Sequence, residues 1–197
     1  GRREEKISRV NVGGVVYEVG READLMAGVE SFILHQGYTG TDEYMAFARA
    51  ALANCGTQAI GTLVTGLPVS QYAELRTRLS TRLMGRHILD TKGTSVEIHD
   101  VLVIPQPLGG LRDYQHERGE SVPLGKQNIL IADMGSVTFD WMLSRRMRAV
   151  PSRSGSCRVG MAMVFHAVRQ SLLGVHKAAP AERDIAEAVI AGEEFVY

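Results

Sequence analysis

Residues 128–141 constrain the fold of this 197-residue chain more than any other stretch. An unbroken apolar run, 129–132, leads to Asp133, a turn containing Gly135 follows, and residues 137–141 read as a second strand. Short apolar runs on either side of a glycine turn are typical of paired strands. The sequence therefore predicts a strand, a tight turn and a second strand.

Two interpretations of this turn stay open on these residues alone. A glycine turn lets backbone N–H groups approach a bound phosphate because no Cβ blocks the way, and a carboxylate at a strand end can hold hydrated Mg²⁺. The pattern Asp133, Gly135, Thr138 and Asp140 is thus that of a phosphate-binding hairpin. Ordinary hairpins also begin with Asp or Asn and turn at Gly for purely conformational reasons.

Charge and cysteine usage limit the classes of function. Twenty-two basic residues balance twenty-two acidic ones, so we expect no direct binding to nucleic acid and none to an anionic membrane. No apolar run reaches the roughly 18 residues that span a bilayer. Cys55 and Cys157 show no CxxC spacing, which argues against a metal site or a disulfide framework and fits a reducing cytoplasm.

Alternating helix and strand patterns in the first half predict an α/β fold. The expected elements are a hairpin over 10–20, a helix from Thr41 or Asp42 to Gly56, a strand over 60–68, a helix capped by Ser70 that ends by Gly85, and a hairpin over 86–104. Residues 21–40 read as surface loop, and their role is not readable from the sequence.

Apolar periodicity also predicts which parts of these elements are buried. The helix that begins near Thr41 is expected to bury the face made by Tyr44, Phe47, Ala48, Ala51 and Leu52. The strand over 60–68 looks buried throughout. Over 95–104 the pattern changes from alternating to continuous apolarity, which predicts a strand half exposed at its start and fully buried at its end.

Gln106 stands between Pro105 and Pro107 at the end of that strand. Open α/β sheets place ligand chemistry at the carboxyl ends of their strands, so Gln106 is a candidate site residue. A glutamine that caps the helix begun by Pro107 fits the same residues equally well.

The remainder of the chain carries three further expectations. Residues 113–126 are polar and read as an exposed connector, and 145–150 as a return strand. The hydroxyls and glycine of 152–157 are expected to precede a helix over 159–172, either as an anion site or as its cap. A last helix has Pro180 in its first turn and ends at Gly192, after which 193–197 begin another strand.

Three motifs together resemble a known family. They are Val64-Thr65-Gly66-Leu67-Pro68, then Val103-Ile104-Pro105-Gln106-Pro107-Leu108-Gly109-Gly110, then Ile131-Ala132-Asp133-Met134-Gly135-Ser136-Val137-Thr138-Phe139-Asp140. In this order and spacing they look like the plasmid-segregation actins, the ParM and StbA-like ATPases. The run Arg153-Ser154-Gly155-Ser156-Cys157 before a methionine-rich helix makes the likeness closest to the protein D family of the plasmid PRTRC system.

The resemblance implies a fold and site roles. The family fold is the actin, Hsp70 and sugar-kinase fold, two ribonuclease-H-like domains with mixed sheets flanked by helices that close on ATP and Mg²⁺. Asp133 matches the aspartate that acts on Mg²⁺ through water, and Asp140 the second acidic position. The phosphate-facing turn is matched by Gly135, Ser136 and Thr138. Gln106 matches the residue that orients the attacking water.

One departure from the family concerns the first phosphate loop. Family members begin with Asp-x-Gly-x-x-x-x-Lys, and nothing before Val10 supplies it. The distal glycines that bind adenine are not found either. The chain therefore looks like an incomplete, internal part of a longer protein, with 1–127 as the latter part of actin-like domain I and 128–197 as the beginning of domain II.

The resemblance implies an ATPase that polymerises into filaments and partitions plasmid DNA through an adaptor protein. Two alternatives remain: a non-polymerising phosphotransferase of the sugar-kinase or Hsp70 kind, and an assembly module that does not turn over ATP.

Overall fold

The computed structural model describes residues 8–20, 37–119, 124–146 and 148–192, which form two compact units. The first unit holds the described residues up to Leu67 together with Gln71–Ile104. The second holds Pro68–Ser70 and the described residues from Pro105 onward. Apart from Pro68–Ser70, the chain thus passes from the first unit to the second after Ile104. Which actin-like domain each part represents stays a prediction.

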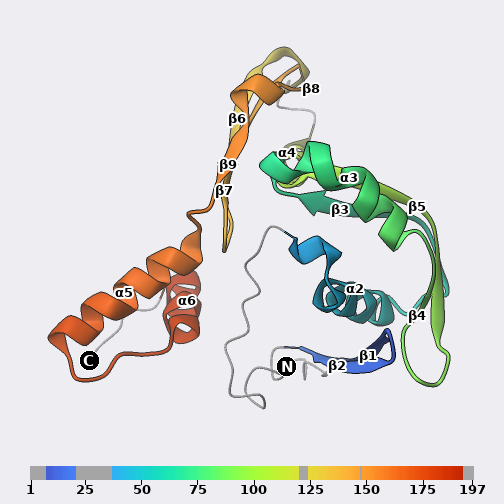
Figure 1. Ribbon diagram of the computed structural model, residues 1–197. Coiled ribbons are helices and arrows are strands. Elements are labelled where there is room, and N and C mark those ends of the chain that lie inside the picture. Colours follow the sequence, from blue (N-terminus) through green and yellow to red (C-terminus); the bar gives the residue numbers. More distant parts are fainter. Residues whose placement is uncertain (1–7, 21–36, 120–123, 147, 193–197) are drawn as a thin grey trace. The chain divides into compact units, whose positions relative to one another are not determined.

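The first unit combines a two-stranded hairpin, a three-stranded sheet and two helices (Figure 1). Its sheet has the order β3-β5-β4, and β4 and β5 are antiparallel. In chain order the elements are β1 (Ser8–Val12), β2 (Val15–Val19), the 3₁₀ turn η1 (Tyr38–Gly40), α2 (Asp42–Asn54), β3 (Ala59–Leu67), α3 (Val69–Leu83), β4 (Gly85–Ile88) and β5 (Ser95–Pro105). Both predicted hairpins, the predicted strand and the two predicted helices are confirmed. The loop predicted for 21–36 lies outside the described residues.

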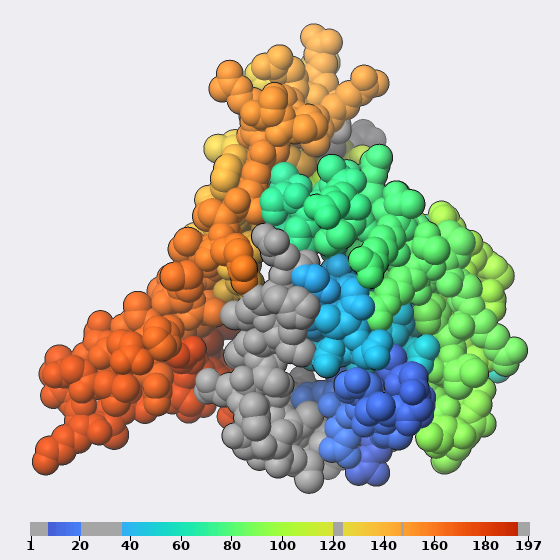
Figure 2. All heavy atoms as spheres, viewed as in Figure 1, coloured from blue at the N-terminus to red at the C-terminus, as the bar shows by residue number. Residues whose placement is uncertain are grey.

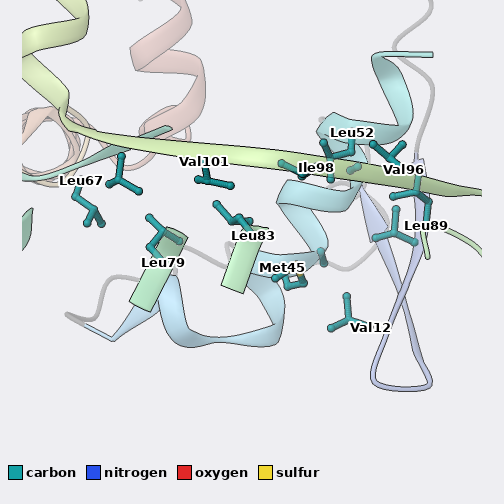
Figure 3. Packing of buried hydrophobic residues seen from close by; sticks show 14 residues of the cluster. Val12, Met45, Leu52, Leu67, Leu79, Leu83, Leu89, Val96, Ile98 and Val101 are labelled. Carbon is teal, nitrogen blue, oxygen red and sulfur yellow. The ribbon is translucent and has the colours of Figure 1, made fainter. Parts of the chain in front are cut away.

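The core of the first unit lies between the helices and the strands (Figure 3). Ile98 of β5, Met45 of α2 and Leu83 of α3 are all at most 5% exposed. Burial of such side chains stabilises a fold by about 1.5–3 kcal/mol each relative to leaving them in water. The buried members are Val10, Val12, Met45, Ala46, Ala50, Leu52, Leu67, Leu79, Leu83, Leu89, Val96, Ile98, Val101 and Val103.

The buried face of α2 agrees with the predicted one only in part, since Leu52 is buried and Tyr44 and Ala48 are half-buried. Thr41 caps the helix as expected, since its Oγ1 accepts a hydrogen bond from the Tyr44 N–H at 3.2 Å. Met45 and Ala46 are buried, however, whereas Phe47 is 56% exposed. The helix packs against β1, β2 and η1. Three-to-four spacing is satisfied by two overlapping faces, so periodicity fixes the helix but not the face it turns inward.

The strands are less buried than predicted. At the end of β5, Val101 and Val103 are buried but Leu102 between them is 51% exposed. In β3 only Leu67 is buried, and Val64 is 55% exposed. Continuous apolarity predicts burial on both faces, but successive side chains of a strand alternate between faces. Leu102 therefore lies on the face opposite to Val101 and Val103, and that face is open at this end of β5.

The second unit is built on a sheet in which β7 is central, flanked by β6 on one side and by β8 and β9 on the other (Figure 1). Helix α4 packs on β6 and β7, and α5 packs on α6. The elements are α4 (Gln106–Arg118), the 3₁₀ turn η3 (Leu124–Lys126), β6 (Asn128–Met134), β7 (Phe139–Arg145), β8 (Arg148–Ala149), the 3₁₀ turn η4 (Pro151–Arg153), β9 (Gly155–Cys157), α5 (Met161–Val175) and α6 (Glu182–Ala191).

Two predictions for this unit are wrong. Residues 113–118 continue α4 instead of forming a connector, because Leu111 is buried and the helix ends only at Gly119, where φ is 62°. No hydroxyl of 152–157 caps α5, the helix that these residues were expected to precede directly. Residues 155–157 pair with β7 as β9, and α5 begins at Met161 with Gly160 as its N-cap.

The helical pair at the end of the chain follows the prediction more closely. Helix α6 ends at Gly192 in the left-handed conformation, but Pro180 precedes its N-cap, Ala181, instead of lying in the first turn. Helix α5, orange in Figure 2, has apolar side chains open to solvent, among them Met163 at 56%. The strand predicted for 193–197 lies outside the described residues. No helix in the described ranges is long and apolar enough to cross a membrane.

Candidate functional site

The predicted hairpin forms with Asp133 and Asp140 directly opposite each other. Strands β6 and β7 are antiparallel, and their last pair before the loop is Met134 with Phe139. The four-residue turn 135–138 closes with a 2.9 Å hydrogen bond from the Gly135 N–H to the Thr138 carbonyl. A Cβ on Gly135 would lie 3.0 Å from that carbonyl oxygen, so the tight closure favours glycine.

Three successive backbone N–H groups of this turn, those of Ser136, Val137 and Thr138, donate to no acceptor within the described part of the chain. Ser136 is exposed, and the other two residues are half-buried. Consecutive unpaired N–H groups in a turn form a concave anion-binding surface. Such an arrangement suits a phosphate oxygen, which only accepts hydrogen bonds.

The carbonyl groups of the same turn are held by the start of α5. The Met161 N–H donates to the Gly135 carbonyl and the Ala162 N–H to the Ser136 carbonyl, both at 2.9 Å. Gly160 makes this approach possible, because a Cβ there would lie 2.3 Å from the Ser136 carbonyl oxygen. The turn is thus fixed from its carbonyl side. Our reading of the sequence missed Gly160, although a glycine just before a helix was a visible signal.

Asp133 has a carboxylate that no other described residue contacts through a hydrogen bond or ion pair, and its side chain is half-buried. A carboxylate at a strand end with no protein donor keeps its oxygens available to a cation or to the waters around one. Asp133 therefore fits a hydrated Mg²⁺ held through water. No group of three His, Cys, Asp or Glu side chains gathers as metal ligands among the described residues.

Asp140 is buried, at 1% exposure, and its two oxygens have three hydrogen-bond donors. Oδ1 accepts from the Val69 N–H at 2.8 Å and from the Ser156 hydroxyl, and Oδ2 accepts from the Thr138 hydroxyl at 2.6 Å. The Ser156 hydroxyl also accepts from the Ser70 N–H at 3.0 Å. The Asp140 carboxylate is therefore directed into the protein, unlike that of Asp133.

This network explains how α3 begins. Ser70 was predicted to cap the helix, but α3 already starts at Val69, and the first N–H groups find acceptors on Asp140 and Ser156. Helix N-termini leave such donors without intrahelical partners. Their acceptors here lie 71 and 86 residues away along the chain, so local sequence could not reveal them.

Gln106 is the exposed first residue of α4. Pro105 is the N-cap and no side chain caps the helix, so the capping role considered for Gln106 is not observed. Helix α4 packs on both strands of the hairpin. In the part of the chain that the structure describes, no hydrogen bond joins Gln106 to the turn. Its site role stays a prediction.

Solved structures with the same fold are actin homologues. The native archaeal actin homologue Ta0583 matches with a TM-score of 0.70 at 19% identity, over 95% of this chain and 61% of that one. The apo pSK41 ParM protein matches with a TM-score of 0.62 at 14% identity, over 98% of this chain and 62% of that one. The AlfA filament bound to AMPPNP matches with a TM-score of 0.56 at 16% identity, over 91% of this chain and 66% of that one. Ta0583 in complex with ADP matches with a TM-score of 0.62 at 18% identity, over 75% of this chain and 49% of that one.

These matches establish the fold as that of the actin-like ATPases, a mixed α/β architecture of sheets flanked by helices. The chain spans about 61% of the length of the native archaeal homologue. No curated protein matches the sequence. Residues 2–109, more than half of the chain, match the model of the actin-like proteins' N-terminal domain. The chain belongs to that family of actin-like proteins.

Proposed function

We propose that this chain is part of an actin-like ATPase in which the β6–β7 hairpin binds phosphate groups of ATP. The observation that carries the proposal is the row of N–H groups on Ser136, Val137 and Thr138, which have no acceptor among the described residues and stand in the turn that follows Asp133. Oriented N–H donors stabilise the charge of a phosphoryl group during transfer. When bound, Mg²⁺ would neutralise part of that charge.

The residues of the site have separate roles in this proposal. Asp133 holds the Mg²⁺ hydration shell, Gly135 permits the tight turn, and Ser136 and Thr138 face the phosphate. Gln106 orients the water that attacks the γ-phosphate. A glutamine is too weak a base to take the proton early, so it acts by positioning, which supplies much of the catalysis in phosphoryl transfer.

The proposal extends to assembly. One matched structure is a filament bound to AMPPNP, and another is a complex with ADP. By analogy, this chain's protein self-associates into filaments in a nucleotide-dependent way. The likeness to the StbA and PRTRC protein D families supports a role in plasmid partitioning through an adaptor protein, in the cytoplasm and without direct DNA binding. The assignment of 1–127 and 128–197 to two actin-like domains belongs to the same proposal.

Replacing Asp133 by alanine tests the site. Because its carboxylate has no partner among the described residues, we expect the free energy of unfolding to change by no more than about 0.5 kcal/mol. Mg·ATP binding, measured by calorimetry, should be lost. Asp113→Ala removes the same charge from an exposed position of α4 and should leave binding unchanged. Equal binding by wild type and Asp133→Ala would refute the site assignment.

Sedimentation with and without ATP tests assembly. Pelleting that requires ATP supports the actin-like function. Phosphate release without pelleting would instead indicate a non-polymerising phosphotransferase, and neither activity would indicate an assembly module.

A further inference from the structure

The Thr138 hydroxyl is the starting point, because it carries one proton. In the structure that proton is donated to Oδ2 of Asp140, at 2.6 Å. A phosphate oxygen is an acceptor, as is a carboxylate oxygen, and one hydroxyl cannot fully donate to both. A phosphate bound at the turn through Thr138 therefore takes a donor away from Asp140.

Asp140 cannot easily replace the lost donor. It is 1% exposed, so water does not reach it freely. Its other oxygen, Oδ1, is already shared between the Val69 N–H and the Ser156 hydroxyl. A buried charge that loses a hydrogen bond is destabilised, because no water takes the place of the lost donor. The side chain is thus driven to reorient, and this moves Oδ1 together with both of its bonds, the one from the Val69 N–H and the one from the Ser156 hydroxyl.

Val69 and Ser70 are the residues of α3 that the network contacts. Their N–H groups open α3 and are held by Asp140 and Ser156. A carboxylate at a helix N-terminus is favoured both by these hydrogen bonds and by the helix dipole. The start of α3 therefore depends on a side chain that also depends on Thr138.

We propose that Thr138, Asp140 and Ser156 form a latch through which occupancy of the phosphate turn controls the first turn of α3. Asp140 is a positioning residue in this latch and does not contact the nucleotide. The inference rests on the proposed function, since it takes a phosphate group as the ligand of the turn. With the turn empty, Thr138 donates to Asp140 and the latch is closed. With phosphate bound, Thr138 donates to the phosphate and the hold on Val69 and Ser70 weakens.

Amide hydrogen exchange at Val69 and Ser70, followed by NMR on the full chain, tests the latch. Mg·ATP should accelerate exchange there by about tenfold, the ratio that corresponds to 1.4 kcal/mol. Ligand binding that merely stabilised the fold would slow exchange instead. Unchanged or slower exchange at both amides, with ATP bound at the turn, would overturn the latch and leave the proposed function standing.

Hydrogen exchange in variants tests the latch in the absence of any ligand. Thr138→Val removes the hydroxyl and should reproduce the fast exchange of the ATP-bound wild type, whereas Thr138→Ser should restore slow exchange. Ser156→Ala should also accelerate exchange at Ser70. Ser154→Ala is the matched control, because its hydroxyl bridges the Leu143 N–H and the Val150 carbonyl instead. If Thr138→Val exchanges at the wild-type rate, the latch is wrong whatever the outcome with ATP. If ATP does not bind, the proposed function fails together with the phosphate control of the latch, whereas the Thr138 and Ser156 variants still decide whether these hydroxyls hold the start of α3.

Discussion

Replacing Gly160 by alanine is expected to destabilise the protein through the phosphate turn. The backbone of Gly160 has φ −111° and ψ −177°, which any L-residue adopts. The obstacle is contact alone: the new Cβ would lie 2.3 Å from the Ser136 carbonyl oxygen and 2.6 Å from the Val137 carbonyl carbon. Both are backbone atoms, so no side-chain rotation relieves the overlap.

The magnitude follows from that overlap. Ordinary contact begins at 3.4 Å, so the start of α5 and the turn must separate by about 1 Å. Overpacking of this kind costs about 1–3 kcal/mol, and it stretches the two 2.9 Å hydrogen bonds from Met161 and Ala162, each contributing about 0.5–1.5 kcal/mol. We expect a loss of about 2–6 kcal/mol in all, which lowers Tm by about 4–24 °C for a chain of this length.

Thermal unfolding followed by circular dichroism measures this effect. Gly174→Ala is the matched control, since it lies within α5 and a Cβ there meets nothing within 4 Å. That change should raise stability by about 0.5–1 kcal/mol because alanine is the better helix former. If Gly160→Ala melts at the wild-type temperature and its turn amides keep their NMR shifts, the close packing of α5 on the turn is wrong.

Three further outcomes are expected. Gln106→Ala should slow phosphate release with little change in ATP affinity, and equal losses in both would contradict an orienting role. Met45→Ala should cost about 2–5 kcal/mol in chemical denaturation, whereas Phe47→Ala on the same helix should stay within about 0.5 kcal/mol; the reverse order would restore the face predicted from periodicity. Hydrogen bonds from the Thr94 hydroxyl and amide lower the pKa of Asp90 below 3.8. The free energy of unfolding that this lowered pKa contributes is present above pH 3.8 and is lost as the pH falls through the lowered pKa. In Asp90→Asn the free energy of unfolding should therefore fall less steeply below pH 3.8 than in the wild type. The same acid dependence in both proteins would contradict this role of Asp90.

Local pattern was sufficient for the hairpin at the site. Alternation and a glycine turn are properties of neighbouring residues, so the pairing of 128–134 with 139–145 could be predicted. The same holds for the Thr41 cap. The burial of Met45 in place of Phe47 on α2 could not be predicted, because the two side chains are similarly apolar. Only the packing of α2 against β1 and β2 distinguishes them.

The hydrogen bonds between residues far apart in the chain could not be predicted from the sequence. Asp133 and Asp140 carry the same group on adjacent strands, and the sequence gives no reason to expect different partners for the two carboxylates. The structure separates them through Val69 and Ser156, which belong to distant segments. Nothing near Asp140 in the sequence indicates that its carboxylate is directed toward the start of another helix.

NMR titration of the full chain with Mg·ATP tests the central claim most directly. The backbone amides of Ser136, Val137 and Thr138 are the donors assigned to the phosphate, so their signals should shift with ATP concentration. Asp133→Ala should abolish those shifts, and Asp113→Ala should preserve them. If all three amides remain unmoved at millimolar Mg·ATP, the β6–β7 turn is not a phosphate site.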